Sequence, residues 1–342
     1  MVHNGKIRVA VDAMGGDYAP QEVVKGAVLA AQKDDVEIFL VGPIDVLKRE
    51  LASCKLRNGT SIHIVEADQV INEDESPIDV IRRKPNCSVA VAARMVKSGQ
   101  ADALVSAGST GAAAISAIQF MGMVDGVYRP ALVGSFGSFA PNTVIVDLGA
   151  NVDCKPHQYL DFAIAGSVYA KRFLNIADPK IALLSTGSEE TKGNDAVREA
   201  HVLLKNSGLN FIGNIEGGDI LRGKANVIVC DGFVGNVLLK FYESIGGHAK
   251  EWTQQKLRKY PPLSALVGLL FDRLFPSTKI AGESERRGGG ILWGVDGVVR
   301  IAHGASQAPQ IANAIESAKE AVKADIVGTM RSELAKFRQG GK

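Results

Sequence analysis

Five short apolar runs in the chain each end in a polar loop that contains glycine, and this repeat constrains the fold more than any other feature. Apolar runs of this length are typical of buried strands, and helical patterns follow several of the loops. Strands that alternate with helices favour a mostly parallel sheet, in which ligands bind beyond the carboxyl ends of the strands. We therefore predict an α/β fold in which the five loops line one cleft. The loops are residues 12–17, 106–111, 147–153, 185–194 and 231–236.

The loop that follows the apolar run Ile181–Leu184 is the strongest candidate for an anion site. It carries Glu190, Lys192, Gly193 and Asn194, and a helical pattern begins directly after it. A lysine and the N–H groups at a helix N-terminus can together face an anion. In isolation, a solvated charged turn would explain this loop equally well. The repetition of polar loops at the other strand ends favours the anion site.

The other four loops contain residues that suit phosphate or an oxyanion. Paired glycines after the first run allow a ligand to approach the backbone closely, although a tight turn would need them as well. The second loop joins a strand to a helix of small residues, which is the geometry of a phosphate cradle or of close helix packing. The candidates are Asp12, Gly15, Gly16, Asp17, Ser106, Gly108, Ser109, Thr110, Asp147, Asn151, Asp231, Gly232 and Asn236, together with Ser88 at the start of another expected helix.

Two further features each have two interpretations. The consecutive cations Arg82, Arg83 and Lys84 precede the helix expected at Ser88. Such a run usually marks a solvated face, but it also suits an acidic partner. His303 follows the strand expected at residues 298–302 and lies beside a glycine, so it has either a structural role or a role near the cleft.

Composition and motif spacing exclude several function classes. The formal net charge of +2 gives no overall attraction to nucleic acid. The four cysteines and six histidines show no metal-ligand spacing, and no dinucleotide-binding GxGxxG occurs. Residues 218–225 nearly match a nucleotide P-loop, but they lack its terminal Ser or Thr, and a strand is expected after them. We therefore predict neither a metal nor a cofactor.

The segment at residues 252–279 is the most unusual part of the chain. Prolines bound an expected helix of roughly three to four turns, which is shorter than the roughly 18 residues of a membrane span. The helix is also too apolar for an ordinary surface, so it must bury itself in the core, in a partner subunit or in a membrane interface. Its apolar face comprises Leu263, Leu266, Val267, Leu270, Phe271 and Leu274.

Six motifs lie in order along nearly the whole chain. They are Asp-Ala-Met-Gly-Gly-Asp at 12–17, Ser-Ala-Gly-Ser-Thr-Gly-Ala at 106–112, Asp-Leu-Gly-Ala-Asn at 147–151, Glu-Thr-Lys-Gly-Asn at 190–194, Asp-Gly-Phe-Val-Gly-Asn at 231–236 and His-Gly-Ala-Ser at 303–306. Together they resemble the bacterial phosphate acyltransferases, the acyl-ACP:phosphate transacylases of phospholipid synthesis. Ser109 departs from that family, which usually has asparagine there, but serine keeps a hydrogen-bonding group.

The resemblance implies a three-layer α/β/α fold with a mostly parallel sheet, similar to the phosphotransacetylases and isocitrate-dehydrogenase-like proteins, in one domain over residues 1–342. Residues 250–279 would project as a helical arm, at the tip of a homodimer or against an anionic membrane surface. The implied reaction moves a long-chain fatty acyl group from acyl carrier protein to inorganic phosphate. Arg82, Arg83 and Lys84 would contact the carrier protein. The product would feed a membrane glycerol-3-phosphate acyltransferase, so we expect a cytoplasmic protein peripherally attached to the inner face of the cell membrane.

The chemistry of this reaction fits the loops. Phosphate is already anionic and nucleophilic at neutral pH, so the protein only has to hold it against a thioester carbonyl and stabilise the oxyanion that develops. Lys192 would supply positive charge, Asn236 a neutral donor, and His303 support for the leaving thiolate or the phosphate. A short-chain phosphotransacetylase that uses coenzyme A would not need the apolar helix. A membrane scaffold that only binds carrier protein would not need the five polar loops.

Overall fold

The computed structural model describes residues 5–33, 35–57, 59–71, 75, 83–135, 140, 142–242, 244 and 289–340. The chain divides into two compact units, one made of Met1–Leu132 with Arg287–Lys342 and the other of Val133–Arg286. The expectation of one catalytic domain over residues 1–342 stays a prediction. Arg82 and the expected arm at residues 250–279 lie outside the described residues. The arm contains Leu263, Leu266, Val267, Leu270, Phe271 and Leu274.

The first unit is built on a mostly parallel sheet. Its strands are β1 (Ile7–Asp12), β2 (Val36–Gly42), β3 (Ile62–Glu66), β4 (Ala103–Ser106), β10 (Gly290–Trp293) and β11 (Val298–Ile301). Their order is β3-β2-β1-β4-β11-β10; neighbours from β3 to β11 are parallel, and β10 is antiparallel to β11. Asp12 pairs in register with Ser106, and Ser106 pairs with Ile301. The carboxyl ends of β1, β4 and β11 therefore lie level at one edge of this sheet.

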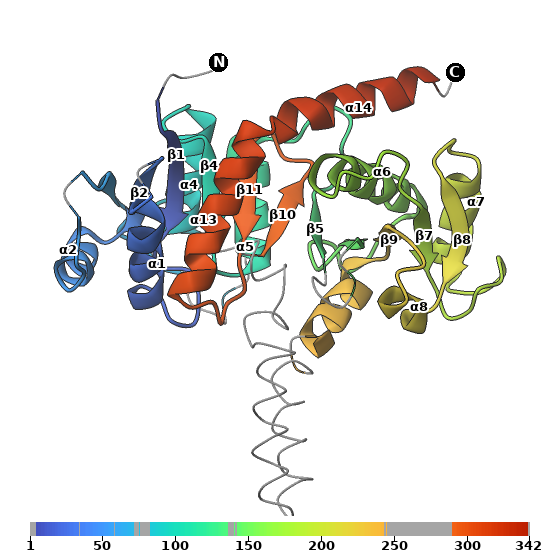
Figure 1. The fold of residues 1–342 in the computed structure, drawn as a ribbon, viewed down its shortest axis with the longest axis horizontal. Coiled ribbons are helices and arrows are strands. Elements are labelled where there is room, and N and C mark those ends of the chain that lie inside the picture. Colours follow the sequence, from blue (N-terminus) through green and yellow to red (C-terminus); the bar gives the residue numbers. More distant parts are fainter. Residues whose placement is uncertain are drawn as a thin grey trace, which may run out of the picture. The chain divides into compact units, whose positions relative to one another are not determined.

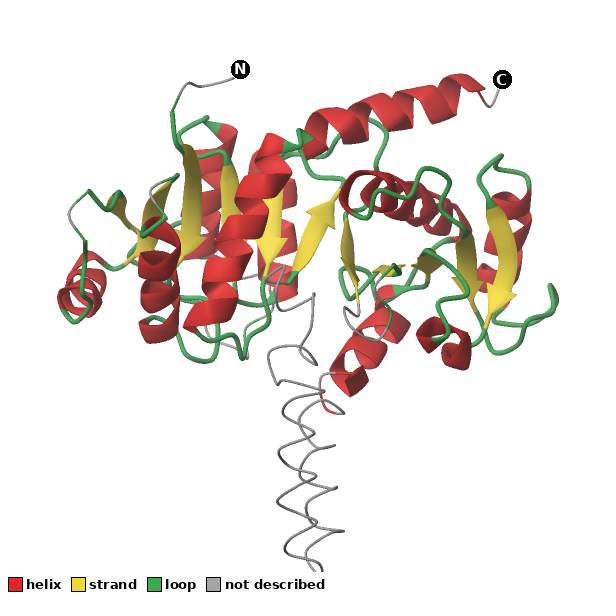
Figure 2. Cartoon of the chain, in the orientation of Figure 1, coloured by secondary structure: helices red, strands yellow, loops and turns green. Residues whose placement is uncertain are grey.

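Helices cover both faces of the sheet in the first unit (Figures 1 and 2). The helices of this unit are α1 (Gln21–Ala31), α2 (Ile44–Ala52), α4 (Ser88–Lys97), α5 (Thr110–Ser116), the π-helix η1 (Ala117–Met121), α13 (Ala308–Lys323) and α14 (Ile326–Gly340). In Figure 1, α1 and α13 lie in front of the strands and α4 lies behind them. The helices α1 and α13 pack closely, since a Cβ on Gly26 would lie 2.5 Å from the Cβ of Ile311.

The second unit repeats the parallel arrangement with different strands. They are β5 (Ala131–Ser135, in this unit from Val133), β6 (Val144–Val146), β7 (Ile181–Leu184), β8 (Phe211–Ile215) and β9 (Val227–Val229). Their order is β5-β6-β9-β7-β8, with β6, β9, β7 and β8 parallel and β5 antiparallel to β6. The helices are α6 (Pro156–Phe173), α7 (Asp195–Lys205), α8 (Gly217–Leu221) and one at residues 232–242.

These elements confirm the α/β class and the mostly parallel strands. The helical pattern from Ala308 to about Phe337 forms two helices, because α13 ends at Lys323 and α14 begins at Ile326. Asp325 causes the break because its φ of 46° lies in the left-handed region, which a helix interior does not use. Its Oδ1 accepts a hydrogen bond from the N–H of Gly328 at 3.2 Å, so the same residue caps the helix that follows.

Candidate functional site

Three polar loops of the second unit follow neighbouring parallel strands. The strands β6, β9 and β7 lie side by side in this order, so their carboxyl ends share one edge of the sheet. Residues 147–155 follow β6, residues 230–236 follow β9, and residues 185–194 follow β7. We call these three segments the loop edge. Ligands bind at such an edge in open α/β sheets.

Asp147 organises the first segment of the loop edge from inside. Its side chain is fully buried, and its Oδ1 accepts hydrogen bonds from the N–H groups of Gly149 at 3.1 Å and Ala150 at 3.0 Å. Its Oδ2 accepts from the backbone N–H of Asn151 at 2.7 Å and from the Nδ2 of the same residue at 2.8 Å. Asp147 and Asn151 thus use these polar atoms to shape the loop, and their direct contact with phosphate stays a prediction.

Glycines let the helix at residues 232–242 pack against the loop that Asp147 shapes. A Cβ on Gly235 would overlap the carbonyl oxygen of Asp147, and a Cβ on Gly232 would lie 2.6 Å from the carbonyl oxygen of Asn151. The N–H of Gly232 also donates to that oxygen at 2.7 Å. The start of the helix is therefore fixed against the loop after β6.

Asn236 lies at the loop edge because its helix packs against the loop after β6. Its side chain is exposed, and a Cβ on Gly149 would lie 3.5 Å from its Oδ1. Gly149 has a φ of 133°, which L side chains rarely adopt, so both its backbone conformation and its surroundings favour glycine. The structure thus brings Asn236 together with the loop at residues 147–155.

Asp231 holds the beginning of the same helix. Its Oδ1 accepts a hydrogen bond from the N–H of Val234 at 2.8 Å, as a helix cap does, and its Oδ2 accepts one from the hydroxyl of Tyr159 at 3.3 Å. Burial and the negative charge of Asp231 raise the pKa of the Tyr159 hydroxyl, which keeps it protonated and able to donate.

Two cysteines near the loop edge remain thiols at neutral pH. Burial, helped by the negative charge of Asp147, raises the pKa of Cys154 to about 12. Burial and the charges of Asp231 and Asp147 raise the pKa of Cys230 well above its usual value. Since the thiolate is the nucleophilic form, neither thiol is suited to attack an acyl group.

Lys192 lies at an exposed position of the segment after β7. Its backbone N–H donates to the carbonyl oxygen of Glu189 at 3.1 Å. Its aliphatic stem lies over Gly187, because a Cβ on that glycine would come within 2.8 Å of the Lys192 Cγ. The next residue, Gly193, has a φ of 98°, which favours glycine at this turn. The loop therefore holds the backbone and stem of Lys192 and leaves the side chain exposed at the loop edge.

The two predicted neighbours of Lys192 have structural partners. The Oδ1 of Asn194 accepts a hydrogen bond from the N–H of Val197 at 2.9 Å and caps α7. The Oε1 of Glu190 lies 2.7 Å from the Nζ of Lys205 on the same helix. These contacts fix the end of the loop to α7, and a contact of either side chain with substrate stays a prediction.

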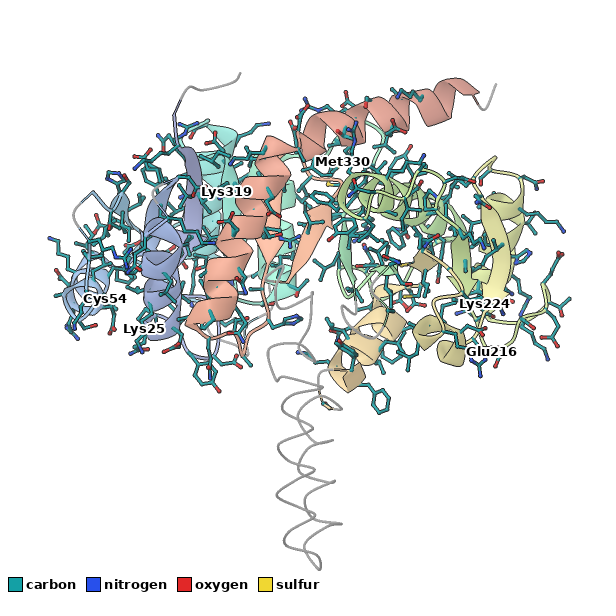
Figure 3. The ribbon with its side chains drawn as sticks, in the orientation of Figure 1. Lys25, Cys54, Glu216, Lys224, Lys319 and Met330 are labelled. Atoms are coloured by element: carbon teal, nitrogen blue, oxygen red, sulfur yellow. The ribbon has the colours of Figure 1, made fainter. Side chains whose placement is uncertain are left out.

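The segment that nearly matches a nucleotide P-loop folds differently. Residues 217–221 form the short helix α8, and β9 follows after a turn, as the sequence predicts. Figure 3 labels Glu216 and Lys224 beside this helix, and the Nζ of Lys224 pairs with the Oδ2 of Asp219 at 3.1 Å. The lysine is therefore bound to a carboxylate within its own turn.

In the first unit, Asp12, Ser88 and Ser106 come together in the core. Asp12 ends β1, Ser106 ends the neighbouring strand β4, and Ser88 begins α4. All three side chains are buried, and the Ser106 hydroxyl donates to the Oδ2 of Asp12 at 2.7 Å. Burial raises the pKa of Asp12, and hydrogen bonds from Ser88 and Ser106 oppose this rise. The three residues form an internal polar cluster at the carboxyl edge of this sheet.

The loops after β1 and β11 touch at the same edge. The N–H of Asp17 donates to the carbonyl oxygen of Gly304 at 2.9 Å. A Cβ on Gly15 would lie 2.5 Å from the Oδ2 of Asp12, so this glycine permits close packing over the buried carboxylate. His303 is half-buried and directly precedes Gly304. The structure thus brings the first motif and the histidine motif together.

The remaining candidates of the first unit lie around the start of α5. Gly16 has a φ of 113°. The N–H of Gly108 donates to the Ser106 hydroxyl at 3.1 Å. Ser109 is exposed at the N-cap position of α5, where its side chain makes no capping hydrogen bond, and Thr110 is the first residue of that helix. Their contact with phosphate stays a prediction.

The basic run before α4 is only partly solvated. Arg83 is exposed, but the Nζ of Lys84 pairs with the Oε2 of Glu75 at 2.6 Å and donates to the carbonyl oxygen of Val70 at 2.8 Å. Lys84 therefore ties two segments of the chain together. The contact of Arg83 and Lys84 with a carrier protein stays a prediction.

Two buried polar residues next to the Lys192 segment have no counterpart in the sequence prediction. The Nδ1 of His201, on α7, lies 2.8 Å from the Oδ1 of Asn214, on β8. Both side chains are buried. Each is a single polar residue in an otherwise unremarkable element, so no local motif signals it.

Two searches over the described residues were negative. That part of the chain contains no group of three or more His, Cys, Asp or Glu side chains placed to hold a metal ion. It also contains no helix that is both long enough and apolar enough to cross a membrane.

Comparison with known proteins shows the family of the chain. The family described as fatty acid synthesis protein matches residues 7–328. A phosphate acyltransferase from Pelotomaculum thermopropionicum is 42% identical over 335 residues, which cover 98% of this chain and 97% of the relative. A phosphate acyltransferase from Nostoc punctiforme is 44% identical over 344 aligned residues, which cover 98% of this chain and 99% of the relative.

Solved structures with the same fold include two acyl-transferring enzymes. A phosphotransacetylase from Streptococcus pyogenes superposes with a TM-score of 0.61 and 19% identity over 93% of this chain and 94% of the other. A branched-chain phosphotransacylase from Enterococcus faecalis superposes with a TM-score of 0.54 and 15% identity over 92% of this chain and 99% of the other. The expected similarity in fold to phosphotransacetylases is confirmed. The chain belongs to the fatty acid synthesis protein family, with the phosphate acyltransferases as its relatives, and is an acyltransferase.

Proposed function

We propose that the protein transfers a long-chain fatty acyl group from the thioester of acyl carrier protein to inorganic phosphate. A phosphate oxygen attacks the thioester carbonyl carbon, and the carbonyl oxygen becomes an oxyanion. The carbon–sulfur bond then breaks, so that acyl phosphate forms and the carrier thiolate leaves and takes up a proton. The relatives' name, phosphate acyltransferase, supports phosphate as the acceptor.

The protonation state of the two loop-edge cysteines supports direct attack by phosphate. An acyl-cysteine intermediate would require a thiolate at the loop edge, but the pKa of Cys154 is raised to about 12 and that of Cys230 is also raised. Phosphate carries its own negative charge at neutral pH. The protein therefore has to position it and stabilise the oxyanion rather than supply a nucleophile.

Lys192 and Asn236 are the exposed side chains to which we assign this stabilisation. The ammonium group of Lys192 would neutralise negative charge on phosphate or on the oxyanion, and the amide of Asn236 would donate a hydrogen bond. His303, two residues beyond the end of β11 in the first unit, is proposed to assist the leaving thiolate or the bound phosphate.

The observation that carries the choice of a fatty acyl group is an apolar stripe beside Asn236. Phe233, Val237 and Phe241 are 61%, 52% and 64% exposed, and their spacing of four residues puts them on one face of the helix at residues 232–242. This stripe is about 12 Å long at 1.5 Å per residue. A fatty acyl chain whose carbonyl carbon lies near Asn236 could cover it, whereas an acetyl group could not.

A comparison of acyl donors tests the proposal. Purified full-length protein would receive palmitoyl-acyl carrier protein or acetyl-coenzyme A, each with and without phosphate, and acyl phosphate would be trapped with hydroxylamine. We expect phosphate-dependent product with the long-chain carrier substrate and much slower reaction with acetyl-coenzyme A. Faster reaction with acetyl-coenzyme A would establish a short-chain phosphotransacetylase instead.

Replacing Asn236 with alanine should lower kcat by about 10²-fold, with a smaller change in KM for the acyl carrier protein, because the lost donor acts mainly on the oxyanion. Steady-state kinetics at saturating phosphate would measure both constants. Asn206→Ala is the matched control, since Asn206 is an exposed asparagine directly after α7 whose Nδ2 donates to the carbonyl oxygen of Val202 in that helix. Equal kcat values for the two variants would make Asn236 a structural residue of the loop edge.

We further propose that residues 263–275 contact an anionic membrane surface in a homodimer, where the product reaches a membrane glycerol-3-phosphate acyltransferase. Burying one Leu or Phe is worth about 1.5–3 kcal/mol, and two copies raise the avidity. Replacing Leu266, Val267 and Leu270 with glutamate should release the protein from anionic liposomes in a flotation assay and leave turnover in solution unchanged.

Gel filtration of the triple variant separates the alternatives. A variant that unfolds or becomes monomeric would place the apolar face in the core or in a subunit interface. A dimeric, active variant that still floats with liposomes would contradict the membrane contact.

A further inference from the structure

We propose that Asn214, oriented by His201, is a positioning residue that holds Lys192 in place for the reaction. This inference rests on the proposed function, because it takes Lys192 as the group that contacts the reacting phosphate or acyl group. Asn214 lies on β8 and His201 lies on α7, so neither belongs to the loop that carries Lys192. Their side chains are only 5% and 4% exposed, so they would act on Lys192 from beneath the loop.

Asn214 and Lys192 meet at one oxygen atom. The Nδ2 of Asn214 donates to the carbonyl oxygen of Glu189 at 2.9 Å, and the backbone N–H of Lys192 donates to the same oxygen at 3.1 Å. The N–H of Ser185 donates to the carbonyl oxygen of Ile215 at 2.9 Å, which ties the beginning of the loop to the same strand. The amide of Asn214 therefore fixes the acceptor that sets the backbone of Lys192.

The position of the Lys192 backbone also decides where its side chain begins. The Cγ of Lys192 and the Oε2 of Glu189 both lie so close to Gly187 that a Cβ there would come within 2.8 Å of each. The stem of Lys192 thus leaves the turn between Gly187 and Glu189, whose carbonyl oxygen accepts the hydrogen bond from Asn214. A shift of the Glu189 carbonyl would move this stem with it.

His201 orients the amide of Asn214. A carbonyl oxygen only accepts hydrogen bonds, so the Nδ2 of Asn214 has to face Glu189 and its Oδ1 has to face His201. The Nδ1 of His201 lies 2.8 Å from that Oδ1 and must therefore carry a proton. The imidazole ring is held edge-on to Phe211, with 5.1 Å between the ring centroids, and its Nε2 lies 3.7 Å from the Oε1 of Glu190.

A buried network of this kind would also stabilise the fold, so a loss of stability alone does not demonstrate positioning. Positioning predicts a loss of kcat in protein that is still folded. It also predicts recovery of kcat by a side chain that restores the same hydrogen bond. The variants below are chosen to separate these two roles.

Asn214→Asp removes the donor to Glu189 and keeps both the size of the side chain and an acceptor for His201. We expect kcat to fall about tenfold to a hundredfold, with a smaller change in KM for the acyl donor, because a small displacement of a reacting group has effects of this size. Hydrogen exchange over residues 185–194, measured by mass spectrometry, should become faster. Asn206→Ala should change neither quantity.

His201→Leu and His201→Asn form a matched pair. Leucine leaves Asn214 without the donor that orients it, and we expect kcat to fall as in Asn214→Asp. The amide nitrogen of an asparagine lies close to the position of an imidazole Nδ1, so His201→Asn should retain most of the wild-type kcat. Melting temperatures would be measured for every variant, and the kinetics would be run well below the lowest melting temperature.

Wild-type kcat in folded Asn214→Asp and His201→Leu would overturn the proposal, even with a lowered melting temperature. Lys192→Ala separates this failure from that of the proposed function. If Lys192→Ala loses turnover while Asn214→Asp keeps it, only the positioning role fails. If Lys192→Ala itself keeps wild-type turnover, the role assigned to Lys192 fails. Faster hydrogen exchange over residues 185–194 would then say nothing about catalysis.

Discussion

Replacing Lys192 with alanine should lower kcat for acyl phosphate formation by about 10²–10³-fold without unfolding the protein. The side chain is exposed, and the hydrogen bond that the residue makes to Glu189 uses its backbone N–H, which alanine keeps. The variant therefore loses a positive charge at the loop edge and little else. Steady-state kinetics with long-chain acyl carrier protein and phosphate would measure the effect, and a melting curve would verify the fold.

Lys180→Ala is the control for this experiment. Lys180 is also exposed and directly precedes β7, so it lies at the amino end of the strand whose carboxyl end leads to Lys192. Loss of the same charge there should leave kcat unchanged. Near-normal turnover in folded Lys192→Ala would remove Lys192 from the reaction.

Replacing Asp147 with alanine should lower the free energy of unfolding by about 3–5 kcal/mol, because two buried and two part-buried donors would lose their acceptor together. The donors are the N–H groups of Gly149, Ala150 and Asn151 and the side-chain amide of Asn151. The carboxylate that accepts from them is fully buried, so water does not readily replace it. Urea denaturation would measure the change.

Asp153→Ala provides the comparison, since Asp153 is an exposed aspartate in the same segment of the loop edge. Its loss should change the free energy of unfolding by no more than about 0.5 kcal/mol. If both variants unfold at the same urea concentration, the Asp147 carboxylate does not hold the loop.

The strands of the loop edge are predictable from sequence because a strand buried on both faces is a continuous apolar run. The strands β6 and β7 each end directly before the first polar loop residue, and Cys230 separates the end of β9 from the polar Asp231. By contrast, β5 and α6 are not predicted from the sequence, partly because each contains a glycine. A Cβ on Gly134 would lie 2.6 Å from the Cδ1 of Leu148, and one on Gly166 would overlap Val227. Close packing needs these glycines, but they weaken the local strand and helix patterns.

The sequence predicts which loops are polar but not where their side chains point. Asp147 and Asp231 are both strand-end aspartates, yet one binds its own loop and the other holds a helix start and the hydroxyl of Tyr159, 72 residues away in the chain. The contact between His201 and Asn214 cannot be predicted from the sequence for the same reason. The contact forms only because α7 and β8 pack together, and each residue alone resembles an ordinary polar position.

The protonated thiols at the loop edge also bear on oxidative stress. Oxidation and alkylation of cysteine proceed through the thiolate, so Cys154 and Cys230 should resist peroxide and haloacetamides at neutral pH. Burial raises the pKa of Cys87 in the same direction. Under the proposed function phosphate is the nucleophile, and no step of the reaction uses a cysteine sulfur. The rate of the reaction would then follow the supply of phosphate and acyl donor rather than the redox balance of the surrounding solution.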